Sequence, residues 1–367
     1  MSYLVPALLQ RSLQPFQAAM SLLNGQPFSL LSIHSDLSEW ALDEEAMGMQ
    51  RIATNLGIQT KLNYGLSPYA KQCCHYTCQF VLKNQRCFKT RNRVSVDYFH
   101  GLPKSSSVFM EVFNGLRRHH HSLARLRVSH SNMESVVLES GIEVDKVHRI
   151  PIGINLDNFK AQTKVNREAI RRYLGLPLSA IVIGSFQKDG DGWGSGIEPK
   201  LIKGPDIFLR VVALLKLRIP ELHILLSGPS RGYIKEGLTR MGVPFYHVFP
   251  KHYKEVGRLF QALDLYLVTS RDEGGPKSLL ESMASYVPLV TTRVGQAVDL
   301  VDHGHNAWMV DTEDVEGLAH WAWHAIDQRV SIGPMLDLAK LTAARNAYDA
   351  QVPLWSGFFE GYIEHRL

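Results

Sequence analysis

The sequence contains few cysteines and no long hydrophobic run. Only four cysteines occur among 367 residues, and all of them lie between Cys73 and Cys87. They do not form two C-x2-C pairs, so free thiols in a reducing compartment are expected rather than a zinc site. No stretch reaches the roughly 20 apolar residues that a membrane-spanning helix needs. The sequence therefore predicts a cytoplasmic protein.

Acidic residues are scarce in one part of the chain. Between Lys71 and His130, eleven lysines and arginines are accompanied by only two acidic residues. Such a segment attracts anionic headgroups and other polyanions, although solvated faces of helices and loops give the same pattern. No nucleic-acid-binding signature occurs, so no nucleic-acid partner is expected. Peripheral contact with an anionic membrane is one expectation, and His119–His121 are expected to form a solvated run.

The remaining composition is that of a globular protein with two domains. Hydrophobic residues make up 45% and charged residues 20% of the chain, which is enough for two ordinary cores. Short apolar runs alternate with longer helical patterns, which is typical of parallel sheets covered by helices. Strands are expected at 28–34, 93–99, 126–130, 147–150, 181–186, 223–227, 245–249, 265–269, 289–292 and 307–310. Helices are expected at 44–56, 132–139, 167–174, 205–218, 253–263 and 277–285, and from 315 onward. The pattern predicts an α/β fold of two doubly wound, Rossmann-like domains that face a cleft.

One segment combines two glutamates with a glycine-rich helix start. Glu273 and Glu281 are separated by seven residues, so the first lies in a loop and the second about one turn into a helix. Glycines let the backbone approach a bound group, and the amides of a helix N-terminus favour phosphate oxygens. The residues expected to contact a ligand there are Gly274, Gly275, Pro276, Lys277, Ser278 and Leu279. Two carboxylates beside an anion site suit a polyhydroxylated phosphate ester.

These motifs resemble glycosyltransferase family 4, whose members have the GT-B fold and retain anomeric configuration. The resemblance covers about residues 150–310. It is carried by residues 150–159, Ile202-Lys203-Gly204, Ser227-Gly228-Pro229, the E-x7-E spacing, 288–295 and 302–306. It implies an acceptor-side domain over 1–155 and a nucleotide-sugar donor domain over 156–345. It also implies a C-terminal helix over 346–367 that returns to the first domain.

The resemblance also implies roles for individual residues. Glu281 would bind the ribose hydroxyls of the donor, Glu273 would hold the donor sugar near its reacting carbon, and Lys203 would neutralise the diphosphate. His100, which follows the strand expected at 93–99, resembles the family's active-site histidine beside the donor sugar. These residues would make the chain a hexosyltransferase acting on a glycan, a lipid-linked or another hydroxyl acceptor, as in polysaccharide biosynthesis.

The chain departs from the family pattern after its first donor-domain strand. The family has an arginine there, whereas Gly184 is followed by Ser185, so Lys188 is expected to supply the second positive charge. The loop that follows contains Asp189-Gly190-Asp191, similar to the D-x-D metal motif of the other large glycosyltransferase fold. A glycine-rich turn produces this pattern easily. No catalytic metal and no cofactor are therefore expected.

Acceptor recognition is the second departure. Relatives have a glycine-rich turn after the first strand, whereas residues 34–45 contain no glycine. Asp36 and Glu39 are the candidate acceptor contacts. The segment 1–23 is expected to be an amphipathic addition, packed on a domain or on a membrane face. Two alternatives stay open: a nucleotide-sugar epimerase or hydrolase on the same fold, and a non-catalytic binding subunit.

Overall fold

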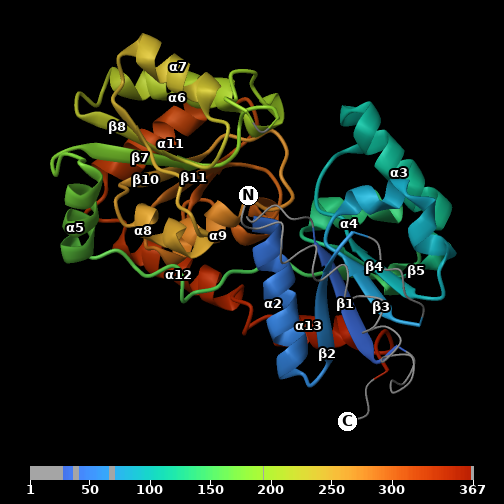
Figure 1. Cartoon of the computed structure of the whole chain (residues 1–367). Coiled ribbons are helices and arrows are strands. Elements are labelled where there is room, and N and C mark those ends of the chain that lie inside the picture. The colour runs from blue at the N-terminus through green and yellow to red at the C-terminus, as the bar shows by residue number, and fades with distance from the viewer. Residues whose placement is uncertain (1–27, 36–40, 66–70, 193, 365–367) are drawn as a thin grey trace.

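A computed structural model describes residues 28–35, 41–65, 71–192 and 194–364. The described chain forms two domains, each built on a six-stranded sheet (Figure 1). The strand orders are β2-β1-β3-β4-β5-β6 and β12-β11-β10-β7-β8-β9, and neighbouring strands are parallel throughout. The predicted α/β fold of two doubly wound domains is confirmed.

The first domain contains a central strand that is buried along almost its whole length. Five of the six residues of β1 are buried, because β2 and β3 flank it and helices cover the sheet. The strands are β1 (Leu30–Ser35), β2 (Gln59–Tyr64), β3 (Cys73–Tyr76), β4 (Arg93–Asp97), β5 (Leu123–Val128) and β6 (Val147–Arg149). The helices are α2 (Ala41–Asn55), α3 (Ser107–His119) and α4 (Ser131–Leu138), with short 3-10 turns η1 (Gln79–Lys83), η2 (Gln85–Lys89), η3 (Pro103–Ser105), η4 (His120–Ser122) and η5 (Val144–Lys146).

The second domain has a hydrophobic cluster on each face of its sheet. Successive residues of a strand point to opposite faces, and Val182 belongs to one cluster while Ile183 belongs to the other. The strands are β7 (Ile181–Phe186), β8 (Leu222–Ser227), β9 (Phe245–His247), β10 (Leu265–Val268), β11 (Leu289–Thr292) and β12 (Trp308–Val310). The helices are α5 (Lys164–Leu174), α6 (Pro205–Lys216), α7 (Gly232–Met241), α8 (Val256–Phe260), α9 (Lys277–Ala284), α10 (Ala297–Leu300), α11 (Val315–Asp327) and α12 (Gly333–Arg345), with 3-10 turns η6 (Leu201–Lys203) and η7 (Tyr253–Glu255).

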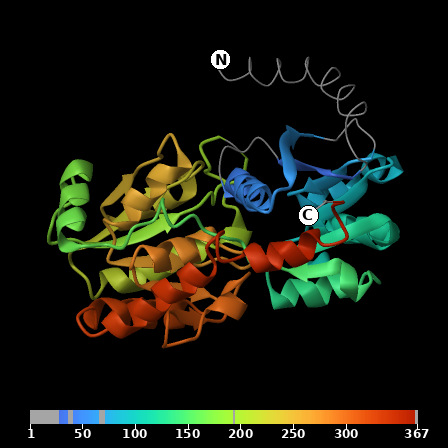
Figure 2. The same cartoon turned by 90° about the horizontal axis from the view of Figure 1, so that it is seen from below.

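The C-terminal helix α13 (Val352–Phe359) packs against the first domain, not the second (Figures 1 and 2). Its aromatic residues Trp355 and Phe358 share a core cluster with Leu31 and Ile33 of β1. The chain therefore crosses between the domains twice, once after β6 and once before α13. Figures 1 and 2 also show α2 at the boundary between the domains.

The described cysteines are all free thiols, and three of the four are buried. Burial raises the pKa of the Cys73 thiol to about 12, so it stays protonated. The expectation of a solvated histidine run is wrong for His120, and His119 is only partly exposed. His120 is only 9% exposed, and His119 stacks on Phe88 with 4.5 Å between ring centroids. Among the described helices, none combines the length and apolar character required to cross a bilayer.

Candidate functional site

The centre of the candidate site is an ion pair between Lys203 and Glu273. Glu273 lies in the loop after β10 and is 8% exposed. One carboxylate oxygen is 2.5 Å from the Lys203 ammonium, and the other accepts a hydrogen bond of 2.9 Å from the Ser270 hydroxyl. Both residues therefore meet at the carboxyl ends of neighbouring strands, where ligands of such sheets bind.

Lys203 is positioned by a turn that requires glycine. It ends η6, and the next residue, Gly204, has a φ of 63° in the left-handed region. A Cβ atom on Gly204 would lie 1.9 Å from the carbonyl oxygen of Thr269. The turn is fixed further by the Gln187 amide, which donates to the Lys203 carbonyl at 3.2 Å. Any side chain at 204 would therefore displace the lysine.

Arg271 clamps the loop that carries Glu273. Its guanidinium forms a bidentate ion pair with Asp206, at 2.8 and 2.7 Å, and a second pair with Glu313. It also donates to the Leu201 carbonyl at 2.6 Å. The clamp joins the loop after β10 to η6 and α6. Arg271 was not predicted as a site residue, although it lies only two residues before Glu273.

Glu281 is buried inside the second domain. It lies on α9, is 4% exposed and accepts a hydrogen bond from the Tyr253 hydroxyl. Burial raises the pKa of Glu281 to about 7, although the Lys277 ammonium opposes the shift. The carboxyl therefore changes its charge near neutral pH.

His100 lies in the first domain and faces the same site. The amide of Gln79 holds its backbone, donating to the His100 carbonyl at 2.6 Å and accepting from the His100 amide at 3.3 Å. Burial, together with the Lys203 ammonium, lowers the pKa of His100 to about 4, while the Glu273 charge opposes the shift. The imidazole is therefore neutral at pH 7 and able to donate or accept a hydrogen bond. Gln79 was not predicted, because no motif marks it.

Lys277 faces the junction of the two domains. Its ammonium donates to Glu45 of α2 at 3.1 Å, to the Tyr348 hydroxyl at 2.8 Å and to the Gly153 carbonyl at 3.2 Å. Its side chain is 9% exposed. The first residue of α9 thus ties this helix to the first domain.

The two glycines of the motif also meet the first domain. A Cβ on Gly274 would lie 2.6 Å from the Cβ of Phe99, and the Gly274 carbonyl accepts a hydrogen bond from Ser129. A Cβ on Gly275 would lie 3.0 Å from Cδ1 of Ile152, in the segment that leaves the first domain, and 3.0 Å from the side chain of Gln296. Their lack of a side chain therefore permits close packing between the domains.

The other residues expected at the helix start have separate environments. Pro276 is the N-cap residue of α9 and makes no side-chain cap bond. Ser278 hydrogen-bonds with the Tyr266 hydroxyl. Leu279 is fully buried in the core, so only its backbone can face a ligand.

The loop expected to supply a second cation contains two lysines near Lys203. Burial is the largest cause that lowers the pKa of the Lys200 ammonium, and the positive charges of Lys203 and Lys188 lower it further. Asp189 is fully buried and forms an ion pair with Arg231, with 3.0 Å between Oδ1 and Nε, whereas Asp191 is exposed. The two carboxylates of the D-x-D-like pattern therefore have different surroundings. Lys200 and Arg231 were not predicted from the sequence.

Three sequence predictions cannot be placed. Asp36, Glu39 and the segment 1–23 lie outside the described residues.

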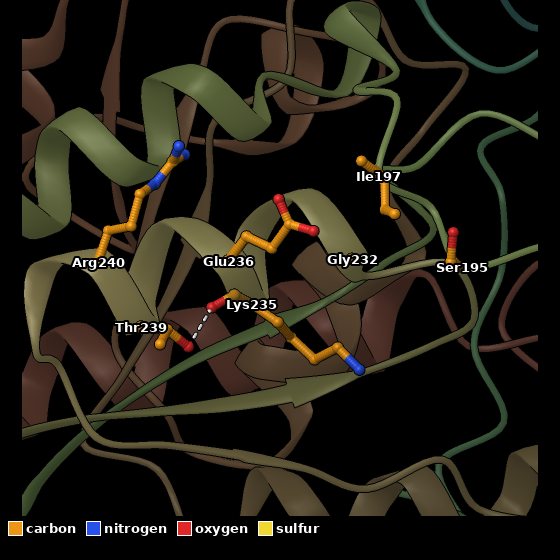
Figure 3. Close-up of a pocket in the computed structure, with 7 residues that line it drawn as sticks. All are labelled: Ser195, Ile197, Gly232, Lys235, Glu236, Thr239 and Arg240. Carbon is orange, nitrogen blue, oxygen red and sulfur yellow. Dashed lines mark hydrogen bonds between the residues drawn. The ribbon is translucent and has the colours of Figure 1, made fainter.

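A separate groove of about 520 Å³ lies between the loop after β7 and α7 (Figure 3). It is lined by Ser195, Ile197, Gly232, Lys235, Glu236, Thr239 and Arg240. None of the predicted site residues lines this groove.

Comparisons with known proteins agree with this architecture. Residues 195–327 match the family model "Glycosyl transferases group 1". The chain is 27% identical over 243 residues to the D-inositol 3-phosphate glycosyltransferase of Corynebacterium urealyticum, covering 62% of this chain and 54% of the relative. It is 32% identical over 185 residues to the enzyme of the same name from Corynebacterium diphtheriae, covering 46% of this chain and 40% of the relative. The chain thus spans about half the length of the curated relatives it matches.

Solved structures resemble the whole fold at low sequence identity. Anabaena HepE in complex with UDP has a TM-score of 0.70 and 16% identity, covering 91% of this chain and 100% of its own. Sucrose-phosphate synthase from Thermosynechococcus elongatus has a TM-score of 0.73 and 12% identity, covering 91% and 98%. The fold predicted from the sequence is therefore confirmed. Residues 195–327 therefore resemble a glycosyl transferases group 1 domain, and the described chain has the GT-B fold.

Proposed function

We propose that this protein is a retaining glycosyltransferase of the family 4 type. It transfers a hexose from a nucleoside-diphosphate sugar to a hydroxyl of a glycan or lipid-linked acceptor. The observation that carries the proposal is the Lys203–Glu273 ion pair, which lies at the strand ends facing His100. The names of the curated relatives, and the complexes of HepE with UDP and UDP-glucose, support a nucleotide-sugar donor.

Residues of both domains take part in the proposed reaction. Glu281 accepts hydrogen bonds from the ribose, and Glu273 orients the sugar. The bond between the anomeric carbon and the diphosphate breaks, while the acceptor oxygen bonds to that carbon on the same face. The acceptor proton passes to the leaving phosphate oxygen. Neutral His100 hydrogen-bonds a sugar or acceptor hydroxyl.

Lysines and helix amides stabilise the negative charge that develops on the leaving diphosphate. Lys203 lies closest to the reacting end, Lys188 adds a second charge, and the start of α9 contributes its amides. These groups supply the electrostatic stabilisation that a divalent ion supplies elsewhere. We therefore propose a reaction that needs neither metal nor cofactor.

Transfer assays with labelled UDP-, GDP- and ADP-hexoses test this function. Lys203→Met and Glu273→Gln are expected to lower kcat by about 100-fold or more, because each removes a positioned charge. Lys235→Met on α7 is the matched lysine control. NMR of the product should show retained anomeric configuration. Near wild-type turnover of both variants would refute the site. An epimer or a free sugar without an acceptor adduct would indicate an epimerase or a hydrolase instead.

We further propose that the acceptor is reached at an anionic membrane surface on the cytoplasmic side. Exposed apolar side chains occur on and before α3, where Leu102 is 51%, Val108 46% and Met110 38% exposed. Lys104 is exposed among them. Apolar side chains together with cations favour the interface of an anionic bilayer. The free, largely buried cysteines support a reducing compartment.

Vesicle sedimentation tests the membrane contact. Binding should need phosphatidylglycerol, fall as salt rises and weaken in Leu102→Asp and Val108→Asp. Leu217→Asp is the matched control, because Leu217 is 83% exposed but lies in the second domain. Equal binding to pure phosphatidylcholine vesicles would contradict the proposal.

A further inference from the structure

The loop after β7 is a paired, closed structure. We call residues 187–192 and 194–200 the strap. Its two arms are joined by an antiparallel bridge between Gly190 and Pro199. The bridge brings the beginning and the end of the strap together, close to where η6 starts.

A fully buried arginine fastens the strap to the sheet. Arg231 is 1% exposed, and one of its nitrogens donates to the carbonyls of Ser185, Gln187 and Ser227 at 2.7, 2.9 and 2.7 Å. Its Nε forms the ion pair with Asp189 of the strap. Removing two charges from water is costly, so such a pair adds little net stability and serves better to select one geometry.

The strap also lies tightly against the start of α7. The first amides of this helix, at Gly232 and Tyr233, donate to the carbonyls of Ser195 and Gly196 at 2.8 Å each. Gly196 has a φ of 72°, and a Cβ there would lie 2.2 Å from the backbone of Ser230. The strap therefore has one defined position on the second domain.

This position places two strap lysines beside Lys203. The Lys200 amide donates to the Asp189 carbonyl at 2.8 Å, so the backbone of Lys200 is tied to the residue that Arg231 holds. The Lys203 amide donates to the Lys200 carbonyl at 2.8 Å, so these two lysines lie within one short turn. Burial and the like charges of Lys203 and Lys188 lower the pKa of the Lys200 ammonium, and the Glu273 charge opposes this shift. Like charges held together in a partly buried site attract an anion.

We infer that Lys200 is a further ligand of the donor diphosphate and that the Asp189–Arg231 pair positions the strap that carries it. The inference rests on the proposed function, since it concerns the same donor site. Lys200 and Lys188 together take the place of the arginine that is missing at Ser185. Because the strap is fastened before the donor binds, the charges need not reorganise during the reaction.

Calorimetric titration with UDP, GDP and ADP tests this inference. The diphosphate that the wild type binds is then titrated into Lys200→Met, with Lys235→Met as the control, because Lys235 lines the separate groove (Figure 3). Lys200→Met should weaken binding about tenfold or more, as expected for a lost charge-assisted hydrogen bond. The same substitution should weaken binding of the corresponding nucleoside monophosphate by a smaller factor. Unchanged diphosphate affinity would overturn the role of Lys200.

A double-mutant cycle tests the positioning role. Asp189→Asn should weaken diphosphate binding in the wild-type background but have little further effect in Lys200→Met, because the strap acts through that lysine. If Asp189→Asn lowers diphosphate affinity equally in the wild type and in Lys200→Met, the positioning role is overturned and the effect is a general structural one. Arg231→Lys provides the same test if Asp189→Asn fails to fold. If the wild type binds none of the three diphosphates, the proposed function itself fails.

Discussion

The stability of this protein should depend on pH through one buried carboxyl. Burial raises the pKa of Glu281 to about 7 from an ordinary value of 4.5. Between these two values the unfolded chain has released the proton while the folded chain still holds it. The free energy of unfolding therefore falls as pH rises through this window and is constant above it.

The size of the effect follows from the shift. Each pKa unit corresponds to about 1.4 kcal/mol, so Glu281 costs the fold about 3 kcal/mol once it is ionised. Glu281→Gln removes this cost but keeps an oxygen that accepts the Tyr253 hydrogen bond. Burial and the Glu281 charge hold the pKa of Tyr253 well above its ordinary value, so this phenol remains a donor throughout.

Urea unfolding of the wild type and Glu281→Gln, at about pH 5 and about pH 8, measures this difference. The change in the free energy of unfolding caused by Glu281→Gln should be about 3 kcal/mol more favourable at about pH 8 than at about pH 5. Glu316→Gln, at an exposed position on α11, is the control. A difference between the two proteins that does not change with pH would refute the account of Glu281 as a buried, easily protonated carboxyl.

Two further substitutions test the framework of the site. Gly204→Ala should abolish diphosphate binding, because the new Cβ clashes with the Thr269 carbonyl. Gly175→Ala, with a φ of 71° and open space around its Cβ, should cost only about 1 kcal/mol and leave binding intact, which calorimetry would verify. Glu45→Gln should lower the free energy of unfolding by about 3 kcal/mol, because it weakens two buried ion pairs, one of them with Arg127 at 2.9 Å. Urea unfolding followed by tryptophan fluorescence would measure it, and a loss below about 1 kcal/mol would contradict the argument.

The second domain was easier to predict from the sequence than the first. Strands β7 and β11 have the predicted bounds, because each is a short apolar run between polar loops. By contrast, β2 was missed, since its residues Gln59–Tyr64 are mostly polar and it lies at the sheet edge. β3 was missed because Cys73–Tyr76 is too short to show a period. Helix α3 was missed because its last turn consists of basic residues, Arg117, Arg118 and His119, so no apolar pattern marks its end.

The site was predictable where one sequence segment carries it. Lys203 and Glu273, which form the ion pair, each lie in a short sequence motif. The family resemblance therefore predicted both residues. Arg231 and Gln79 act through backbone carbonyls or amides that are close only in the folded chain. No spacing in the sequence reveals such partners. The same holds for Lys277, whose partner Glu45 is 232 residues away.

The position of Lys277 links helix α9 to the arrangement of the domains. Glu45 accepts from Lys277 and from Arg127, and Arg127 also donates to the carbonyls of Ile150 and Pro151, where the chain leaves the first domain. Lys277 begins the helix that carries Glu281 one turn later. Breaking the contact between Glu45 and Lys277 would leave charges in a buried interface, which is costly. Helix α9 and the crossing between the domains are therefore energetically coupled, so a change in domain orientation that breaks this contact also changes the surroundings of the helix that carries Glu281.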